Sequence, residues 1–215
     1  MRVLKEKFYG RETLRVAEEL LGKFLVRNID GVLVGGKIVE TEGYLGIDDK
    51  GCHAYGGKKT PKIMPLYGKP GTAYIYSIYG MYYCLNAIAE KEEVPEGVLI
   101  RAIEPLFGLD VMAQKRNKKS YEELSKKEIL NLTSGPSKLC MALDIDKKLN
   151  NTFLWEGNMY ILERDHKLEN LFETKEMPCG NVIKTKRIGI DYAEEAKDFP
   201  YRFYYEKNPY VSKKG

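Results

Sequence analysis

Residues 72–89 read TAYIYSIYGMYYCLNAIA, and this stretch is the strongest fold signal in the 215-residue sequence. Aromatic and β-branched residues fill it, which is typical of β-strands. Gly80 interrupts the run. We therefore expect two strands that are joined by a tight turn near Ile78, Tyr79 and Gly80.

The segments around this hairpin extend the same pattern. FLVRN (24–28), a turn at Ile29–Gly31 and VLVGGKIVETEGYL (32–45) predict a second hairpin, in which Gly35-Gly36 indicates a bulge or a close backbone approach. Further strands are expected at 97–105, 158–163 and 181–190, followed by a Pro- and Tyr-rich tail, and helices at 12–21, 109–115, 121–130 and 138–143. Directly joined strands outnumber strand–helix–strand units, so we expect a mixed α/β class with an antiparallel or mixed sheet.

Residues 46–71 are rich in glycine, proline and lysine and predict one long loop. A loop of this length inside a domain is usually functional or disordered. We expect order, because the loop contains residues that can anchor it to a core, namely His53, Tyr55, Met64, Leu66 and Tyr67.

Composition sets the broad class. The chain is 43% hydrophobic and 31% charged, which suits one globular domain over residues 1–215. No apolar run approaches the ~20 residues of a membrane span, and the N-terminus has no apolar signal core. We therefore expect a cytoplasmic protein, associated with the nucleoid if the source is prokaryotic. The formal net charge of +4 permits a nucleic-acid partner without requiring one.

Several chemistries are excluded by missing motifs. None of the four cysteines forms a CxxC pair and only two histidines occur, which argues against a finger-like zinc site. Cys52 beside His53 is better interpreted as an ordinary cysteine than as a metal pair. The patterns GxSxG, GxxxxGK[ST] and GxGxxG are absent, so serine hydrolases, P-loop proteins and dinucleotide enzymes are not indicated.

One acidic strand end could carry chemistry. Glu40, Glu42 and Tyr44 share a strand face, and a carboxylate at the end of a buried strand is a candidate general base. A solvated strand end with surface ion pairs is the more common alternative. Arg101 lies in an apolar strand and needs a carboxylate partner, for which Glu42 or Glu104 is available. This arginine could form a purely structural salt bridge, or it could orient a catalytic carboxylate and a water molecule.

The tyrosines of residues 74–83 suggest contact with bases. Tyr74 and Tyr76 on one face would form a stacking platform, and Tyr79 at a hairpin tip could wedge between base pairs. Ordinary half-buried packing is an equally good interpretation. Asn86 needs partners if buried and could contact a base edge. The basic clusters Lys115–Lys119 and Lys184–Arg187 are more typical of solvated faces than of phosphate contacts.

Together these residues resemble the alkyladenine (3-methyladenine) DNA glycosylase family. The resemblance spans most of the chain, in the family's order, and is most specific where ETEGY, YIYSIYGMYYCLN and VLIRAIEP occur together. It implies an α+β fold, with a single mixed domain around a curved antiparallel sheet, flanking helices and a protruding hairpin. The matching stretches are LLGKFLVR (20–27), IVETEGYLG (38–46), PGTAYIYSIYGMYYCLN (70–86), VLIRAIEP (98–105), SGPSKLCMAL (134–143), RIGI (187–190) and YRFY…NPYVS (201–212).

The resemblance also implies a role for each matching residue. Glu42 would activate water, and Arg101 would help to hold Glu42 and that water. Tyr44, His53 and Tyr76 would sandwich a flipped base. Asn86 would screen against a guanine-type amino group, and Tyr79 would intercalate into the vacated stack. The remaining positions expected to touch DNA are Lys58, Thr60 and Met81. The resemblance implies that no metal and no organic cofactor is needed.

The function implied is a monofunctional glycosylase that acts as a monomer on double-stranded DNA containing damaged purines. Its lesions would belong to the 3-methyladenine, 7-methylguanine and hypoxanthine class, and it would initiate base excision repair. Two alternatives use the same residues. One is a nucleic-acid-binding module without catalysis, and the other, weaker one is a hydrolase of free nucleosides, which would leave Tyr79 unexplained.

Overall fold

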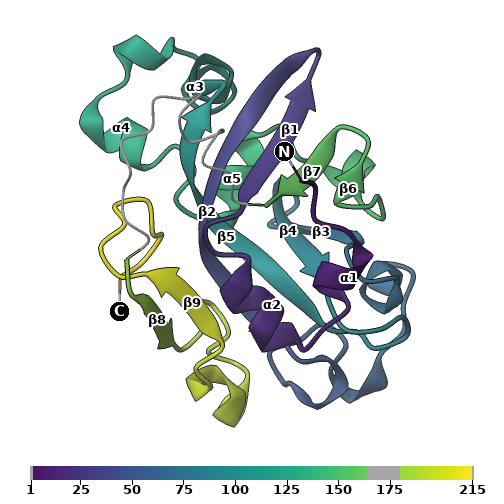
Figure 1. The fold of residues 1–215 in the computed structure, drawn as a ribbon. Coiled ribbons are helices and arrows are strands. Elements are labelled where there is room, and N and C mark those ends of the chain that lie inside the picture. Colours follow the sequence, from purple (N-terminus) through teal and green to yellow (C-terminus); the bar gives the residue numbers. More distant parts are fainter. Residues whose placement is uncertain (1, 164–179, 215) are drawn as a thin grey trace.

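The computed structural model describes residues 2–163 and 180–214, and all strands in these ranges belong to one curled antiparallel sheet (Figure 1). The main path runs β3-β4-β5-β2-β1-β7-β6, and β8 and β9 form a branch that joins the sheet at β2. The mixed α+β class and the antiparallel pairing confirm the sequence prediction. The strands are β1 (Phe24–Ile29), β2 (Val32–Tyr44), β3 (Ala73–Ile78), β4 (Tyr82–Ile88), β5 (Gly97–Phe107), β6 (Trp155–Glu156), β7 (Met159–Leu162), β8 (Val182–Thr185) and β9 (Arg202–Tyr205).

The long strand β2 organises the sheet. One of its edges pairs with β5 along most of its length. The other edge pairs first with β1, through Val32–Lys37, and then with β9, through Glu40–Glu42. Register shifts between Ile38 and Thr41 mark bulges, which bend a strand locally. The bend lets one edge of β2 serve two different neighbours.

Gly35 and Gly36 show both features that the sequence indicated. The β2–β5 register shifts between them, which marks an irregularity in the strand. A Cβ at Gly35 would lie 2.2 Å from the carbonyl oxygen of Leu25, and one at Gly36 would lie 1.9 Å from that of Glu104. Neighbouring backbones therefore approach here more closely than any side chain would allow.

Short helices cover the sheet. The α-helices are α1 (Glu6–Tyr9), α2 (Thr13–Glu19), α3 (Leu109–Asn117), α4 (Lys126–Leu130) and α5 (Pro136–Ala142). α2 packs on β2 and β5, and α5 packs on β4 and β5 (Figure 1). The buried faces of these two helices are apolar and join the main core, through Val16 and Ala17 in α2 and Leu139 and Ala142 in α5. In the described part of the chain, no helix combines the length and hydropathy that crossing a bilayer requires.

The helix predicted over 121–130 is divided in two. A 3₁₀ turn covers Tyr121–Glu123, and α4 begins separately after Ser125. The reason is local, because Ser125 and Glu128 form a capping box in which the Glu128 N–H donates to the Ser125 hydroxyl at 3.3 Å. A capping box starts a new helix and so interrupts a longer one.

Two predictions near the C-terminal end were wrong. The strand expected over 181–190 ends at Thr185, because the next arginine, Arg187, turns inward to an ion pair with Asp49. The tail, for which no strand was predicted, contains β9, whose Arg202 pairs with Glu40 of β2. In both places a buried charge pair decides the path of the chain.

The long loop over 46–71 is ordered into three 3₁₀ turns, Gly46–Asp48, Tyr55–Gly57 and Met64–Tyr67. Leu66 and Tyr67 are buried anchors, as predicted. His53, Tyr55 and Met64 are exposed, contrary to the prediction that they anchor the loop. The other loop residues in the hydrophobic cluster around Leu66 and Tyr67 are Cys52, Ala54 and Ile63, whose side chains are small or aliphatic.

We expect Gly36→Ala to destabilise the fold by about 3 kcal/mol, because the new Cβ would press on the backbone of β5 rather than on a side chain that can move. Urea unfolding of the variant beside the wild-type chain measures this change. The matched control is Gly10→Ala, whose Cβ would meet its nearest atom at an ordinary 3.5 Å. Equal midpoints for all three proteins would contradict the close approach.

Candidate active site

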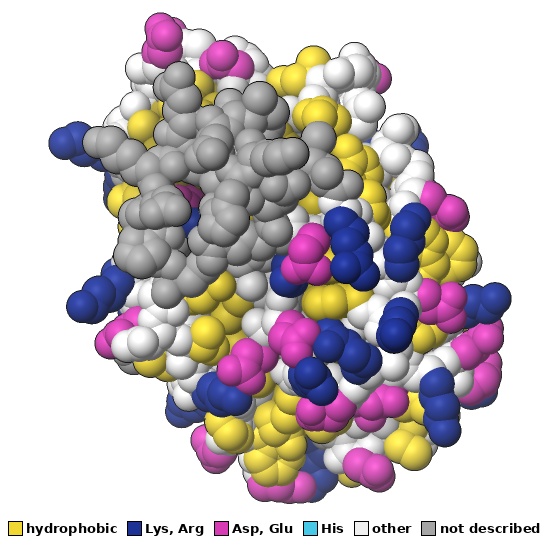
Figure 2. All heavy atoms as spheres, in the orientation of Figure 1, with side chains coloured by type: hydrophobic (Ala, Val, Ile, Leu, Met, Phe, Trp, Pro, Cys, Tyr) yellow, Lys and Arg dark blue, Asp and Glu magenta, His cyan; other side chains and the backbone are white. Residues whose placement is uncertain are grey.

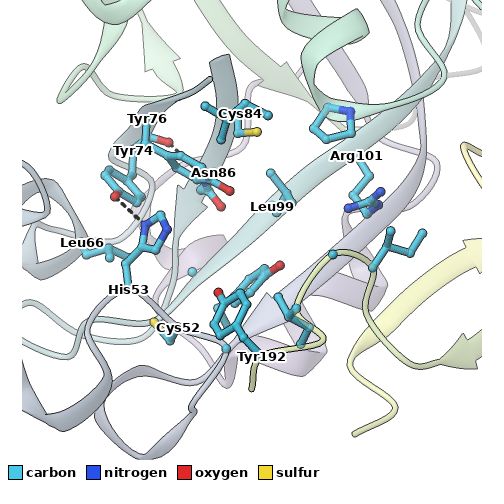
Figure 3. A pocket seen from close by; sticks show the side chains of 18 of the residues that line it. Cys52, His53, Leu66, Tyr74, Tyr76, Cys84, Asn86, Leu99, Arg101 and Tyr192 are labelled. Carbon is cyan, nitrogen blue, oxygen red and sulfur yellow. Dashed lines mark hydrogen bonds between the residues drawn. The ribbon is translucent and has the colours of Figure 1, made fainter. Parts of the chain in front are cut away.

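A cavity of about 430 Å³ opens beside the β3–β4 hairpin (Figure 3). One side is built by β3, β4 and the loop that carries His53, and the floor includes Leu99 and Arg101 of β5. The other side is built by the segment that follows β8. Six of the residues to which the family resemblance assigns a role line this cavity: Tyr44, His53, Tyr76, Tyr79, Asn86 and Arg101.

Three aromatic rings form one wall. Tyr74 and Tyr76 share a strand face, with ring centroids 5.5 Å apart, as the alternation predicted. The His53 ring meets the Tyr76 ring edge-on at 4.6 Å, and its Nδ1 shares a hydrogen bond of 2.9 Å with the Tyr74 hydroxyl. Burial raises the pKa of both tyrosines, so their hydroxyl groups remain protonated. The wall is therefore neutral and rich in π faces.

His53 is the titratable member of this wall. Partial burial of the ring lowers its pKa below 6.5, and the charges of Lys62 and Lys58 lower it further. The ring is therefore neutral at pH 7. A neutral imidazole can accept or donate one hydrogen bond at each nitrogen, which fits its contact with the Tyr74 hydroxyl.

A buried charge cluster lies beneath the cavity. Glu40 and Glu42 are both fully buried. This burial rules out the alternative interpretation, a solvated strand end with surface ion pairs. Arg101 bridges them, with Nε 2.9 Å from Glu40 and Nη1 3.2 Å from Glu42. Arg202 of β9 adds a second cation, 2.8 Å from Glu40. Burial lowers the pKa of Arg101, but Glu42 and Glu40 outweigh this effect and keep it above its usual range.

The alternative partner proposed for Arg101 was wrong. Glu104 lies farther along β5 and pairs with Lys37 at 3.0 Å. It also accepts a hydrogen bond of 3.0 Å from Asn208. Glu104 lies three residues after Arg101 on β5, where its register partner on β2 is Lys37 rather than Glu40 or Glu42.

Glu42 is held from three directions. Its Oε2 accepts hydrogen bonds from the Tyr44 hydroxyl at 2.9 Å and from Arg101, and its Oε1 accepts from the Ile188 N–H at 2.8 Å. Glu42 itself does not line the cavity, but all three donor residues do. Burial, and then the charge of Glu42, raises the pKa of Tyr44, so this hydroxyl remains a donor. The carboxylate therefore stands directly behind the cavity wall in a fixed orientation.

Asn86 lies on β4 and is 6% exposed. Its Nδ2 donates to the carbonyl oxygen of Tyr74 at 3.1 Å across the hairpin. This contact meets the need for a partner that the sequence indicated. The bond fixes the amide plane, so the group that faces the cavity beside Leu99 has a defined position (Figure 3).

The hairpin tip is exposed and tightly turned. Tyr79 and Gly80 both have positive φ, 50° and 75°, which is the type I′ turn favoured between strands. Tyr79 is 89% exposed and Met81 is 67% exposed. Lys58 and Thr60 are also exposed, on the loop over 46–71, and neither lines the cavity. The predicted DNA contacts therefore lie outside the pocket, and only Tyr79 stands at its mouth.

Sequence reasoning missed the wall opposite the rings. Ile188, Gly189, Ile190 and Tyr192 line it. Arg187, interpreted from sequence as part of a solvated basic cluster, is buried against Asp49 with contacts of 2.5 and 2.7 Å. The only sequence signal for this wall was the RIGI stretch at 187–190. Within residues 2–163 and 180–214, no group of three or more His, Cys, Asp or Glu side chains is placed to hold a metal, and His166 and Cys179 lie outside these ranges.

Surface charge on one face carries no uniform sign. Figure 2 shows Lys and Arg side chains interspersed with Asp and Glu side chains over the lower half of that view. Lysine–carboxylate pairs occur among the described residues, as in Lys50 with Glu194 and Glu195 at 2.6 and 2.9 Å. A phosphate backbone is attracted by a basic surface, so this face is not organised to bind one.

Comparison with known proteins identifies the family. The family model for methylpurine-DNA glycosylase matches residues 7–209. A protein of Clostridium tetani is 55% identical over 98% of this chain and 99% of its own length, and one of Desulfitobacterium hafniense is 50% identical over the full length of both. Each is named "Putative 3-methyladenine DNA glycosylase". The chain belongs to the methylpurine-DNA glycosylase family.

Membership of this family makes the chain a DNA glycosylase of the 3-methyladenine type, a hydrolase of DNA repair. The resemblance stated from sequence is thereby confirmed, and so is its choice of an enzyme over a binding module without catalysis. DNA is the substrate that the family implies.

We expect His53 to titrate below pH 6.5, which ¹H–¹⁵N spectra of the imidazole measure, with His53→Asn to assign the signal. The unfolded chain, at about 6.5, takes up the proton first. The stabilisation linked to His53 is therefore present above pH 6.5 and lost as pH falls through the folded pKa. Lys62→Ala should raise the midpoint and Lys69→Ala should not. A wild-type midpoint above 6.5 would contradict the environment described.

Proposed function

We propose that this enzyme flips alkylated or deaminated purines out of duplex DNA and hydrolyses their N-glycosidic bond with a water activated by Glu42. The observation that carries the proposal is the position of Glu42. A fully buried carboxylate, oriented by three donors, stands directly behind an aromatic cavity of a size that suits a base.

The cavity wall supports recognition of damaged purines. Tyr76 and His53 on one side and Tyr44 on the other offer π faces to a planar guest. An N-alkylated purine is cationic, and a cation is attracted by the negative face of an aromatic ring. Such a base is also the least costly to extrude, because damage weakens its stacking and pairing. Asn86, fixed by its bond to Tyr74, would press against the amino group of a normal guanine.

The exposed turn supports extrusion. Tyr79 projects from a rigid type I′ turn at the mouth of the cavity. An aromatic ring in this position would fill the gap that the base leaves in the stack. Met81, two residues after Tyr79, is exposed, as are Lys58 and Thr60 of the loop over 46–71, and these residues would contact the DNA on either side.

The chemistry needs one proton acceptor and one nucleophile. Glu42 accepts a proton from water, the water oxygen bonds to C1′ of the sugar, and the C1′–N bond breaks with its electron pair going to the base. The negative carboxylate also stabilises positive charge that develops on the sugar. Arg101 is permanently charged and cannot act as the base, so its role is to orient Glu42 and the water.

We expect Glu42→Gln to lower base release at least about 1,000-fold and to leave binding of the damaged duplex intact, because the amide keeps the shape but accepts no proton. Single-turnover release of 7-methylguanine and hypoxanthine from duplex DNA measures the first effect, and fluorescence anisotropy measures the second. Glu156→Gln, at an exposed strand end, is the control. Normal excision by Glu42→Gln would remove Glu42 as the base.

We expect Tyr79→Ala to lower excision from duplex DNA about tenfold or more, since one stacked ring is worth ~1–3 kcal/mol. The defect should shrink when the same lesion is presented in single-stranded DNA, where no stack has to be opened. Leu33→Ala, at an exposed position near the tip of the β1–β2 hairpin, should have no effect on either substrate. An equal defect on both substrates would argue against intercalation.

A further inference from the structure

A buried ion pair stands behind the Tyr44 wall. The Arg187 side chain is 0% exposed and that of Asp49 is 2% exposed. Two parallel bonds join them, from Nη1 to Oδ2 at 2.5 Å and from Nη2 to Oδ1 at 2.7 Å. Arg187 also donates to the carbonyl oxygens of Gly43 at 3.0 Å and Ala196 at 3.2 Å. Such a fork is held in one plane and one orientation.

The guanidinium of this pair is sandwiched between two rings. Its carbon lies 4.7 Å from the centroid of Tyr44 and 5.3 Å from that of Tyr201. Tyr44 lines the cavity but Arg187 does not. Arg187 therefore covers the face of Tyr44 that is turned away from the cavity, and the ring separates this cation from any guest.

We propose that Asp49 and Arg187 form a positioning pair that fixes the Tyr44 ring and sets its preference for cationic over neutral bases. A bare cation behind an aromatic ring repels a second cation on the front face. The Asp49 carboxylate, bound through both oxygens, cancels the Arg187 charge at short range. The front face of Tyr44 thus keeps the negative potential that attracts an N-alkylated purine.

The inference rests on the proposed function, in which Tyr44 stacks on the flipped base. A positioning role of the Asp49–Arg187 pair differs from a purely structural role in one measurable respect, the ratio of activity between lesions. Arg187 precedes Ile188, whose N–H orients Glu42, so general damage to this segment would slow the release of every lesion equally. A change in the charge behind Tyr44 would instead alter the ratio between lesions.

The test compares Asp49→Asn with the wild-type protein. The amide keeps one acceptor for Arg187 but leaves the cation uncompensated. We expect kcat/KM for 7-methylguanine, which is cationic, to fall about tenfold relative to kcat/KM for hypoxanthine, which is neutral, in duplexes of one sequence. Asp48→Asn, the exposed neighbour, is the control and should keep the wild-type ratio.

Two further variants complete the test. Arg187→Gln at pH 8 leaves the carboxylate alone behind Tyr44, so the same ratio should rise, and this variant decides the question if Asp49→Asn does not fold. The double variant with both charges removed should return the ratio to the wild-type value. Equal losses on both lesions in the variants would overturn the inference. Failure of the wild-type protein to release either base would instead overturn the proposed function.

Discussion

The rest of this structure depends on the pairing of Glu40 with Arg101 and Arg202. Glu40 is fully buried, and an unpaired charge at such a position would cost several kcal/mol. Its oxygens bind Arg101 from β5, Arg202 from β9 and the N–H and hydroxyl of Ser212. These contacts bring two strands, β5 and β9, and the tail to one point of β2. The second carboxylate of that strand, Glu42, inherits its orientation from the same arginine, Arg101.

Near Glu40, the residues of the candidate site differ in what supports them. The carboxylate, its arginine and the platform of Tyr74 and Tyr76 stand on paired strands, whereas Tyr79 is carried by a turn. Groups that must be placed to a fraction of an ångström are thereby held by the sheet. One wall of the cavity comes from the hairpin and the other from the segment after β8. The shape of the cavity therefore depends on contacts between distant parts of the sequence.

The sequence was informative where structure is decided locally. The two hairpins followed from alternation and from turn residues such as Asp30-Gly31, and Glu40 and Glu42 were placed on one face by the period of the strand. Prediction failed where the structure depends on contacts between residues far apart in the sequence. β9 and the wall at residues 188–192 depend on Arg202 with Glu40 and on Arg187 with Asp49, pairs that are 162 and 138 residues apart. The apolar strand around Arg101 indicated that this arginine is buried, but no local pattern did so for Arg187 or Arg202. The extent of the domain over residues 1–215 and the monomeric state stay predictions.

The distance between Glu40 and its partners has a consequence for synthesis. The carboxylate leaves the ribosome long before Arg202 and Ser212, which follow it by 162 and 172 residues. Closing so long a loop is entropically costly and is compensated only when the final contacts form. Until then Glu40 can pair with Arg101, 61 residues away, but it lacks Arg202 and Ser212, so we expect this part of the nascent sheet to stay partly hydrated. We therefore expect the pocket to become organised only when β9 has docked on β2.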